Sequence, residues 1–141
     1  MIPPIVYRNL VKYCESVVAD ARRRLKLRKR IASGDLYNSI KYYIDIRTGD
    51  FGFMYNEYGK WVEWGRRRNS TPPPVGPIRD WIRQKGLKLN PYAVAKSIGK
   101  KGIKPAPFIT PAIEKSQNYL AYILEEAIVA QIEWDMNQTE Q

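Results

Sequence analysis

The fold class is decided by the stretch Ile40-Lys41-Tyr42-Tyr43-Ile44-Asp45-Ile46-Arg47-Thr48-Gly49-Asp50-Phe51-Gly52-Phe53-Met54-Tyr55. Apolar and polar side chains alternate over residues 40–47, and this period of two predicts a half-buried β-strand. Thr48-Gly49-Asp50 predicts a tight turn, after which Phe51, Phe53 and Tyr55 alternate on a second strand. The stretch therefore predicts a β-hairpin with one apolar face. A lone hairpin is not stable, so this face has to pack on other elements.

Long helices are expected on both sides of this hairpin. Residues 5–31 carry an apolar stripe at three- and four-residue steps, formed by Leu10, Cys14, Val17, Ala21 and Leu25. We expect Ser33-Gly34-Asp35 to end this helix. Residues 112–136 carry a second stripe, formed by Ile113, Leu120, Leu124, Ile128 and Ile132 and broadened by Ile123 and Ala127. Residues 137–141 form a polar tail.

The middle of the chain predicts short elements separated by backbone breakers. Residues 58–65 favour a short helix over an irregular turn, with aromatic side chains closing one end of the core. Residues 66–77 combine three arginines with a proline run, so we expect a flexible loop that serves as a spacer or a subunit contact.

Two further short helices and an extended strap are expected after this loop. Pro77 starts a helix over residues 78–85 that Gly86 ends, and Asn90-Pro91 starts another over residues 92–98 that Gly99 caps. Prolines hold residues 106–110 extended. The whole pattern predicts one α+β domain over residues 1–141, with a small antiparallel sheet packed against the long N- and C-terminal helices.

The composition excludes much chemistry. The 141 residues contain no histidine and one cysteine, Cys14, so His-based catalysis, His-ligated metals and intrachain disulfides are impossible. We expect Cys14 to be a buried structural thiol. A glycine-rich phosphate loop and a metal-ligand cluster are also missing. Glu57 and Glu63 are the best-placed carboxylates for acid–base work, but neither has an obvious partner nucleophile. We therefore expect no enzyme activity and no cofactor.

The charge is strongly positive and unevenly placed. The formal net charge is +10, with basic clusters at residues 22–30 and 66–68 and further basic residues from 79 to 104. After Phe108 the sign reverses, because six acidic residues oppose only Lys115. A basic body with an acidic end fits a nucleic-acid partner or head-to-tail contact between copies of the chain. No apolar run reaches the ~20 residues of a membrane span, so no membrane partner is expected.

Several short motifs follow one another in a characteristic order. They are Ser33-Gly34-Asp35-Leu36-Tyr37-Asn38-Ser39-Ile40, Trp61-Val62-Glu63-Trp64-Gly65, a proline-led Ile-x-x-Trp helix at 78–86, Ala95-x-x-Ile98 before Gly102, and Pro-x-Pro-Phe-x-x-Pro-Ala at 105–112. The ordered set, over about residues 33–125, resembles the neck proteins of tailed bacteriophages. Those proteins join head to tail or complete the tail. After the second motif this family often has threonine, where this chain has Arg66-Arg67-Arg68.

The resemblance implies a non-enzymatic α+β subunit of a virion. Such subunits form a homo-oligomeric ring, commonly a hexamer, between the portal or adaptor and the tail, and DNA passes through it. Assembly would take place in the host cytoplasm. We expect contacts with partners or other subunits from Trp61, Glu63, Trp64, Arg66, Arg67, Arg68, Pro73, Trp81, Arg83, Lys104 and Phe108. We expect contacts with DNA or an acidic partner from Arg22, Arg23, Lys100 and Lys101.

A second hypothesis comes from basic residues interleaved with tyrosine and tryptophan. Such surfaces bind single strands by stacking and phosphate neutralisation. The chain would then be a small nucleic-acid-binding protein, or an RNA-cleaving, toxin-like enzyme that works without histidine. Glu63 and Arg67 are the residues on which cleavage would depend.

Overall fold

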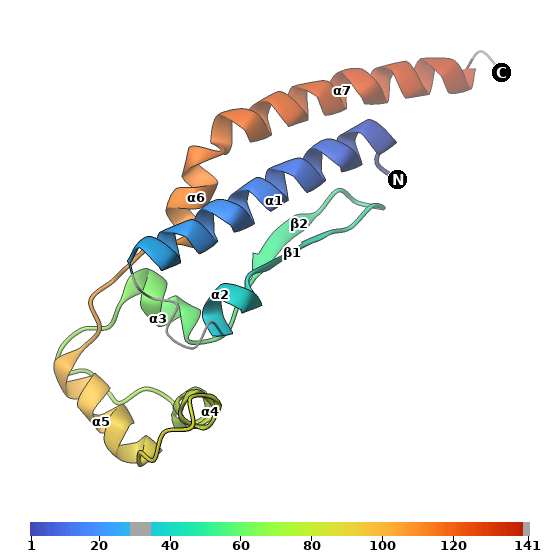
Figure 1. Ribbon diagram of the computed structural model, residues 1–141. Coiled ribbons are helices and arrows are strands. Elements are labelled where there is room, and N and C mark those ends of the chain that lie inside the picture. Colours follow the sequence, from blue (N-terminus) through green and yellow to red (C-terminus); the bar gives the residue numbers. More distant parts are fainter. Residues whose placement is uncertain (29–34, 140–141) are drawn as a thin grey trace. The chain divides into compact units, whose positions relative to one another are not determined.

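The computed structural model describes residues 1–28 and 35–139 (Figure 1). It is α+β, with a two-stranded antiparallel sheet and long helices near both ends of the chain, which confirms the predicted fold class. The elements in chain order are α1 (Pro4–Leu27), α2 (Asp35–Ser39), β1 (Lys41–Ile44), β2 (Phe51–Met54), α3 (Gly59–Trp64), α4 (Val75–Gln84), α5 (Pro91–Lys101), α6 (Ile109–Lys115) and α7 (Gln117–Thr139).

The chain divides into two compact units. Unit 1 contains Met1–Ala21, Lys41–Met54 and Ile109–Gln141, and unit 2 contains Arg22–Ile40 and Tyr55–Phe108. Unit 1 therefore holds the hairpin, α6, α7 and most of α1, whereas unit 2 holds the short helices between them. The single domain over residues 1–141 stays a prediction.

The predicted hairpin forms and packs on α1 in unit 1. Lys41 pairs with Met54 and Ile44 with Phe51 in antiparallel register. Tyr13 of α1 lies edge-on to Phe51, with ring centroids 5.7 Å apart, and also contacts Phe53. The apolar face of β1 ends at Ile44, because Ile46 lies in the turn and is exposed. An aromatic contact between sheet and helix thus supplies the support that a two-stranded sheet needs.

Helix α1 carries the main apolar surface of unit 1. Its buried side chains in this unit are Val6, Leu10, Tyr13, Cys14, Val17, Val18 and Ala21. In Figure 1, α1 lies between the hairpin and α7, and Asn9 of α1 donates a hydrogen bond to the Glu126 carboxylate of α7. The predicted stripe of α1 is therefore correct. The prediction missed Tyr13, whose ring faces the sheet. The predicted end of this helix at residue 31 lies outside the described residues.

The expected long C-terminal helix is present as α7, but its predicted start and its predicted buried stripe are wrong. The predicted range includes parts of two helices, α6 and α7, with a turn at Ser116 between them. Its predicted stripe is also not buried, since Leu124, Ile128 and Ile132 are all more than half exposed. In α7 only Ile123 is buried. Regular apolar spacing identified the helix correctly, but spacing alone does not say which partner covers the stripe.

Unit 2 is built around a small apolar cluster that joins α3, α4 and α5. Trp61, Ile78, Ile82 and Ala95 are buried in it. Both α4 and α5 are longer than predicted. Helix α4 begins at Val75, ahead of Pro77, and Pro77 is tolerated there because the first turn needs no intrahelical N–H donor. Residues 66–74 therefore remain outside helices and strands, apart from a bridge at Arg66.

Helix α5 continues through the glycine that was expected to cap it. Its N-terminus is as predicted, since the side chain of Asn90 accepts a hydrogen bond from the Tyr92 backbone N–H. Its C-cap is Gly102, with φ +75°, and not Gly99. Gly99 is buried inside the helix, where a Cβ would lie 2.8 Å from the Ser70 carbonyl oxygen. Close approach of the 66–74 segment thus explains this glycine. Residues 109–110, expected in the strap, already belong to α6, and α2 was not predicted.

Burial of Cys14 makes stability depend on pH in the alkaline range. The thiol is fully enclosed, and burial, with a smaller contribution from the Glu15 carboxylate, raises its pKa from 9.0 to about 11. The unfolded thiol ionises first, so the free energy of unfolding should fall between about pH 9 and 11, by up to roughly 3 kcal/mol from this group. Below pH 9 this contribution is fully present.

Denaturant unfolding of the wild type and of Cys14→Ala, measured from pH 7 to 11, checks this expectation. The free energy of the wild type should fall more steeply above pH 9 than that of the variant. The tyrosines ionise in both proteins, so the difference between the two curves reports Cys14. Parallel curves would contradict the assignment.

Candidate functional site

Two of the sequence motifs meet inside unit 2. The Trp61-Val62-Glu63-Trp64-Gly65 motif forms α3 and its C-cap, and residues 104–108 run beside it without regular secondary structure. A Glu63 carboxylate oxygen accepts a hydrogen bond of 2.6 Å from the Phe108 backbone N–H. The Ala106 N–H donates to the Val62 carbonyl at 2.7 Å. The prolines of the strap therefore hold backbone donors against α3, which explains why the two motifs belong together.

The surroundings of this contact are closed. Glu63 is 1% exposed and Phe108 is fully buried. Tyr55 lies edge-on to Phe108, with centroids 5.2 Å apart. Burial raises the pKa of Tyr55, and the negative charge of Glu63 raises it further. Gly65 adds a backbone constraint, because a Cβ there would lie 2.5 Å from the Ile103 carbonyl oxygen. We call Val62, Glu63, Gly65, Ala106 and Phe108 the strap junction.

Burial corrects four of the expected partner contacts. Trp61, Glu63, Pro73 and Phe108 are enclosed by their own chain. An enclosed side chain offers no surface to a partner, so these four residues have internal packing roles. Aromatic residues beside basic ones looked like a binding surface in the sequence. In the structure the small apolar cluster and the strap junction use most of these aromatics. Trp64 is the exception, since it is about two-thirds exposed.

The basic residues expected to contact partners gather at one edge of unit 2. Arg66 and Ile103 form an antiparallel bridge, and the Asn69 N–H donates to the Lys100 carbonyl. These bonds place the arginine run beside the C-terminus of α5. The exposed cations there are Arg67, Arg68, Lys100, Lys101 and Lys104, which we call the basic edge. Two groups that were predicted separately thus form one surface.

Arg66 and Arg22 hold structure together more than they face a partner. The Arg66 guanidinium lies 5.5 Å from the Trp61 ring centroid and donates to the Thr71 carbonyl. Arg22 donates to the carbonyls of Tyr37 and Ile40 and lies over the Tyr37 ring. It therefore fixes α2 to the end of α1. Arg23, the other residue expected to face DNA or an acidic partner, is exposed.

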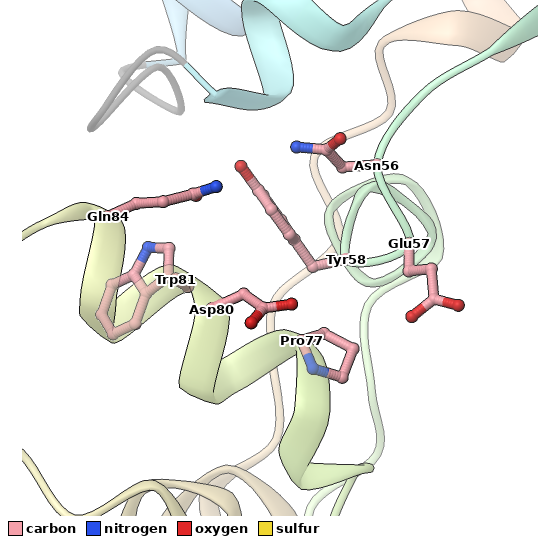
Figure 2. Close-up of a pocket in the computed structure, with 7 residues that line it drawn as sticks. All are labelled: Asn56, Glu57, Tyr58, Pro77, Asp80, Trp81 and Gln84. Atoms are coloured by element: carbon pink, nitrogen blue, oxygen red, sulfur yellow. The ribbon is translucent and has the colours of Figure 1, made fainter.

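A cavity of about 260 Å³ lies between the start of α3 and helix α4 (Figure 2). Figure 2 shows the Tyr58 ring projecting toward Asn56 and Gln84, with the carboxylates of Glu57 and Asp80 nearer the base of the ring. Burial raises the pKa of Tyr58, although a hydrogen bond with Asn56 partly opposes this. Asp80 already pairs with Arg83.

The lining of this cavity contains carboxylates, amides and aromatic rings. The pKa of the Tyr58 hydroxyl is raised, which is the opposite direction from that of an activated nucleophile. Among residues 1–28 and 35–139, no cluster of side chains could hold a metal ion. Glu63 has no open face, so a substrate could not reach it. Glu63, one of the residues on which the cleavage hypothesis depends, is therefore buried, and that hypothesis stays a prediction.

Sequence reasoning did not identify helix α7 as an exposed apolar surface. Helix α7 exposes eight large apolar side chains, which are Tyr119, Tyr122, Leu124, Ile128, Val129, Ile132, Trp134 and Met136. With 3.6 residues per turn, these positions surround most of the helix. A helix that is apolar on all sides is normally buried. The sequence signal was present in the apolar spacing, but it was assigned to the subunit's own core. In the described part of the chain, no helix has the length and apolar character to cross a membrane.

A second exposed surface lies at the turn between α4 and α5. Leu87, Leu89 and Tyr92 are exposed there beside Lys88. The Lys85 ammonium lies 4.5 Å from the Trp81 ring centroid, and Arg79 lies over the Tyr92 ring. We call residues 85–92 the α4–α5 turn. Of the expected contacts, Trp81 is partly covered, and Arg83 is exposed in its ion pair with Asp80.

Comparisons with known proteins add no relative of this chain. No protein-family model, no curated protein and no solved structure matches it. A proposal on function therefore depends on the residues, their order along the chain and their packing.

The strap junction should be sensitive to loss of the Glu63 acceptor. Glu63→Ala leaves the buried Phe108 N–H without that partner, and we expect it to lower the free energy of unfolding by about 1–3 kcal/mol. Glu63→Gln keeps an acceptor and should cost clearly less. Chemical denaturation measures both, and amide exchange at Phe108 locates the effect. Equal losses in the two variants would show that charge, and not the hydrogen bond, is what matters.

Glycine substitutions separate close packing at the junction from backbone strain. Gly65→Ala combines φ +71° with a 2.5 Å clash, so we expect a loss of about 3 kcal/mol or more. Gly86→Ala is the matched control, because φ is +64° but the space around it is open. It should lose only about 1–2 kcal/mol. Thermal or denaturant unfolding tests the ranking, and a reversed order would argue against tight packing at Gly65.

Proposed function

We propose that this chain is a structural subunit of a tailed-bacteriophage virion. It assembles as a homo-oligomeric ring at the head–tail junction, where it connects the portal or an adaptor to the tail and lets DNA pass. In this proposal it has no enzyme activity and needs no cofactor. Its partners are further copies of itself and the neighbouring portal, adaptor and tail proteins.

The packing of the strap junction carries this proposal. The family resemblance depends on short motifs, any one of which could arise by chance. Glu63 and Phe108 belong to two different motifs of the set, and they are joined by a buried hydrogen bond. Gly65, in the same motif as Glu63, and Gly102, in a third motif, each lie where a Cβ would clash with backbone atoms. Contacts among three of the five motifs support the proposal, because they give these residues a shared structural role.

The exposed surfaces suit a subunit of an assembly. Helix α7 exposes more apolar side chains than a monomeric protein usually leaves in water. The basic edge supplies five exposed cations that could meet DNA or an acidic neighbour. In a ring, α7 would be covered by contacts with other protein, and the basic edge would face the channel or the adjacent ring.

A nucleic-acid-binding protein is the second candidate, and the basic edge favours it. Its five cations without an intervening carboxylate would neutralise phosphates and release counterions. This candidate explains neither the apolar surface of α7 nor its acidic residues. It also predicts tight binding, whereas a ring through which DNA moves should hold DNA weakly.

Light scattering coupled to size-exclusion chromatography tests the proposal. We expect the purified chain alone to form a closed oligomer of defined mass. Negative-stain images of this species should show rings, and addition of portal or tail-tube protein should give a larger complex. A strict monomer that binds neither portal nor tail-tube protein would refute the proposal.

Salt-dependent DNA and RNA binding separates the two candidates. A ring protein should bind with modest affinity, and the double variant Arg67→Glu and Arg68→Glu should leave its assembly intact. For the second candidate the same variant should abolish tight binding, and the logarithm of the affinity should fall steeply with the logarithm of salt concentration.

A further inference from the structure

Helix α7 has an apolar surface that its own unit does not cover. Its exposed apolar residues include Ile128 at 63% and Met136 at 58% exposure. Burial of apolar surface is favourable, so covering several of these side chains would stabilise a complex. Leu124, Ile128, Ile132 and Met136 follow one another at four-residue steps and so form one continuous ridge along the helix.

A groove of about 380 Å³ runs beside this ridge within unit 1. Ile5, Tyr122 and Val129 contribute its apolar lining, and Glu125 and Glu133 also line it. In the described part of the chain, the carboxylates of Glu125 and Glu133 have no hydrogen bond and no ion pair. The Glu126 carboxylate accepts hydrogen bonds from the side chains of Tyr122 and Asn9. The groove therefore suits a segment that brings apolar side chains together with a cation.

Charge decides against pairing of α7 with α7 of another copy. Residues 117–139 contain four carboxylates and no lysine or arginine. A two-fold contact between two such helices would bring like charges together. All 24 lysines and arginines lie before Gln117. The complementary surface is therefore elsewhere on the chain.

The α4–α5 turn has the matching chemistry. Lys88 is exposed between the exposed side chains of Leu87 and Leu89, and Tyr92 continues the apolar surface. Residues 87–90 have no regular secondary structure, so their side chains can enter a groove. Lys88 between Leu87 and Leu89 therefore matches a groove that is lined by apolar side chains and carboxylates.

We infer that the α7 groove of one copy receives the Leu87-Lys88-Leu89 segment of a second copy, with Lys88 beside Glu125 and Glu133. The contact joins two different surfaces, so it is heterologous. Heterologous contacts generate rings when the rotation closes. The inference rests on the proposed ring and names the subunit contact that builds it. The ridge of α7 is covered in the same contact, by Tyr92 and its apolar neighbours.

Charge reversal on each side tests the contact. The groove variant carries Glu125→Lys and Glu133→Lys, and the turn variant carries Lys88→Glu. Alone, each faces a like charge across the contact, and we expect its association constant to fall roughly tenfold or more. Mixed in equal amounts, the two variants should assemble again, because every contact then pairs opposite charges. Lys41→Glu, an exposed substitution in β1, is the matched control and should assemble like the wild type.

Sedimentation velocity and light scattering give the outcome, with circular dichroism to verify folding. If the turn variant assembles normally, α7 does not contact the α4–α5 turn, and the inference is overturned. Failure of the mixture to assemble also overturns it. A third outcome would also overturn the inference. If the wild type is monomeric and the substitutions change its thermal stability but not its mass, α7 is covered by its own chain.

The same data separate this inference from the proposed function. If the wild type forms a ring that binds portal or tail protein, and neither the groove variant nor the turn variant changes its assembly, the contact is refuted and the proposed function is not. Assembly that follows the charges, in a protein that binds neither portal nor tail protein, supports the contact and refutes the function.

Discussion

The hydrogen bond from the Phe108 N–H to the Glu63 carboxylate is the contact on which the organisation of unit 2 depends. A buried carboxylate is costly unless hydrogen-bonded, and this one is enclosed by aromatic and apolar groups. The bond fixes a strap whose prolines prevent it from forming a helix or a regular strand. Once the strap is fixed, α3 and the bridge between Arg66 and Ile103 follow, and with them the position of the basic edge.

This arrangement explains why residues that looked like binding determinants are internal. Tryptophan, arginine and glutamate next to backbone breakers are typical of interaction surfaces, and the same composition serves to close a small core. Trp61 is covered by the Arg66 guanidinium and by the apolar cluster of unit 2. Composition cannot separate these two uses, because the deciding fact is a contact between residues that are 45 positions apart.

Local patterns in the sequence were sufficient for most elements. The alternation at residues 40–47 gave the hairpin, and the Asn90 cap and Pro91 gave the start of α5. Helix boundaries failed where tertiary contacts override local preference. Gly99 lies inside the helix, and its lack of a Cβ lets the segment at Ser70 and Pro72 approach closely. The C-cap is therefore Gly102 and not Gly99. The break at Ser116 and the gathering of the five cations of the basic edge also depend on packing that no local pattern encodes.

The apolar spacing of α7 shows where such prediction stops. Spacing says that a stripe will be covered, and it was natural to assume a cover within the subunit. The charge of α7 indicates what kind of surface covers it. Its uniform negative charge disfavours another acidic surface and favours a basic one. Apolar surface supplies the free energy of association, and charge selects which surface is matched. A chain that separates its acidic residues from its cations in this way favours head-to-tail contact over two-fold pairing. In the proposed ring, such contacts would add one copy at a time until the ring closes.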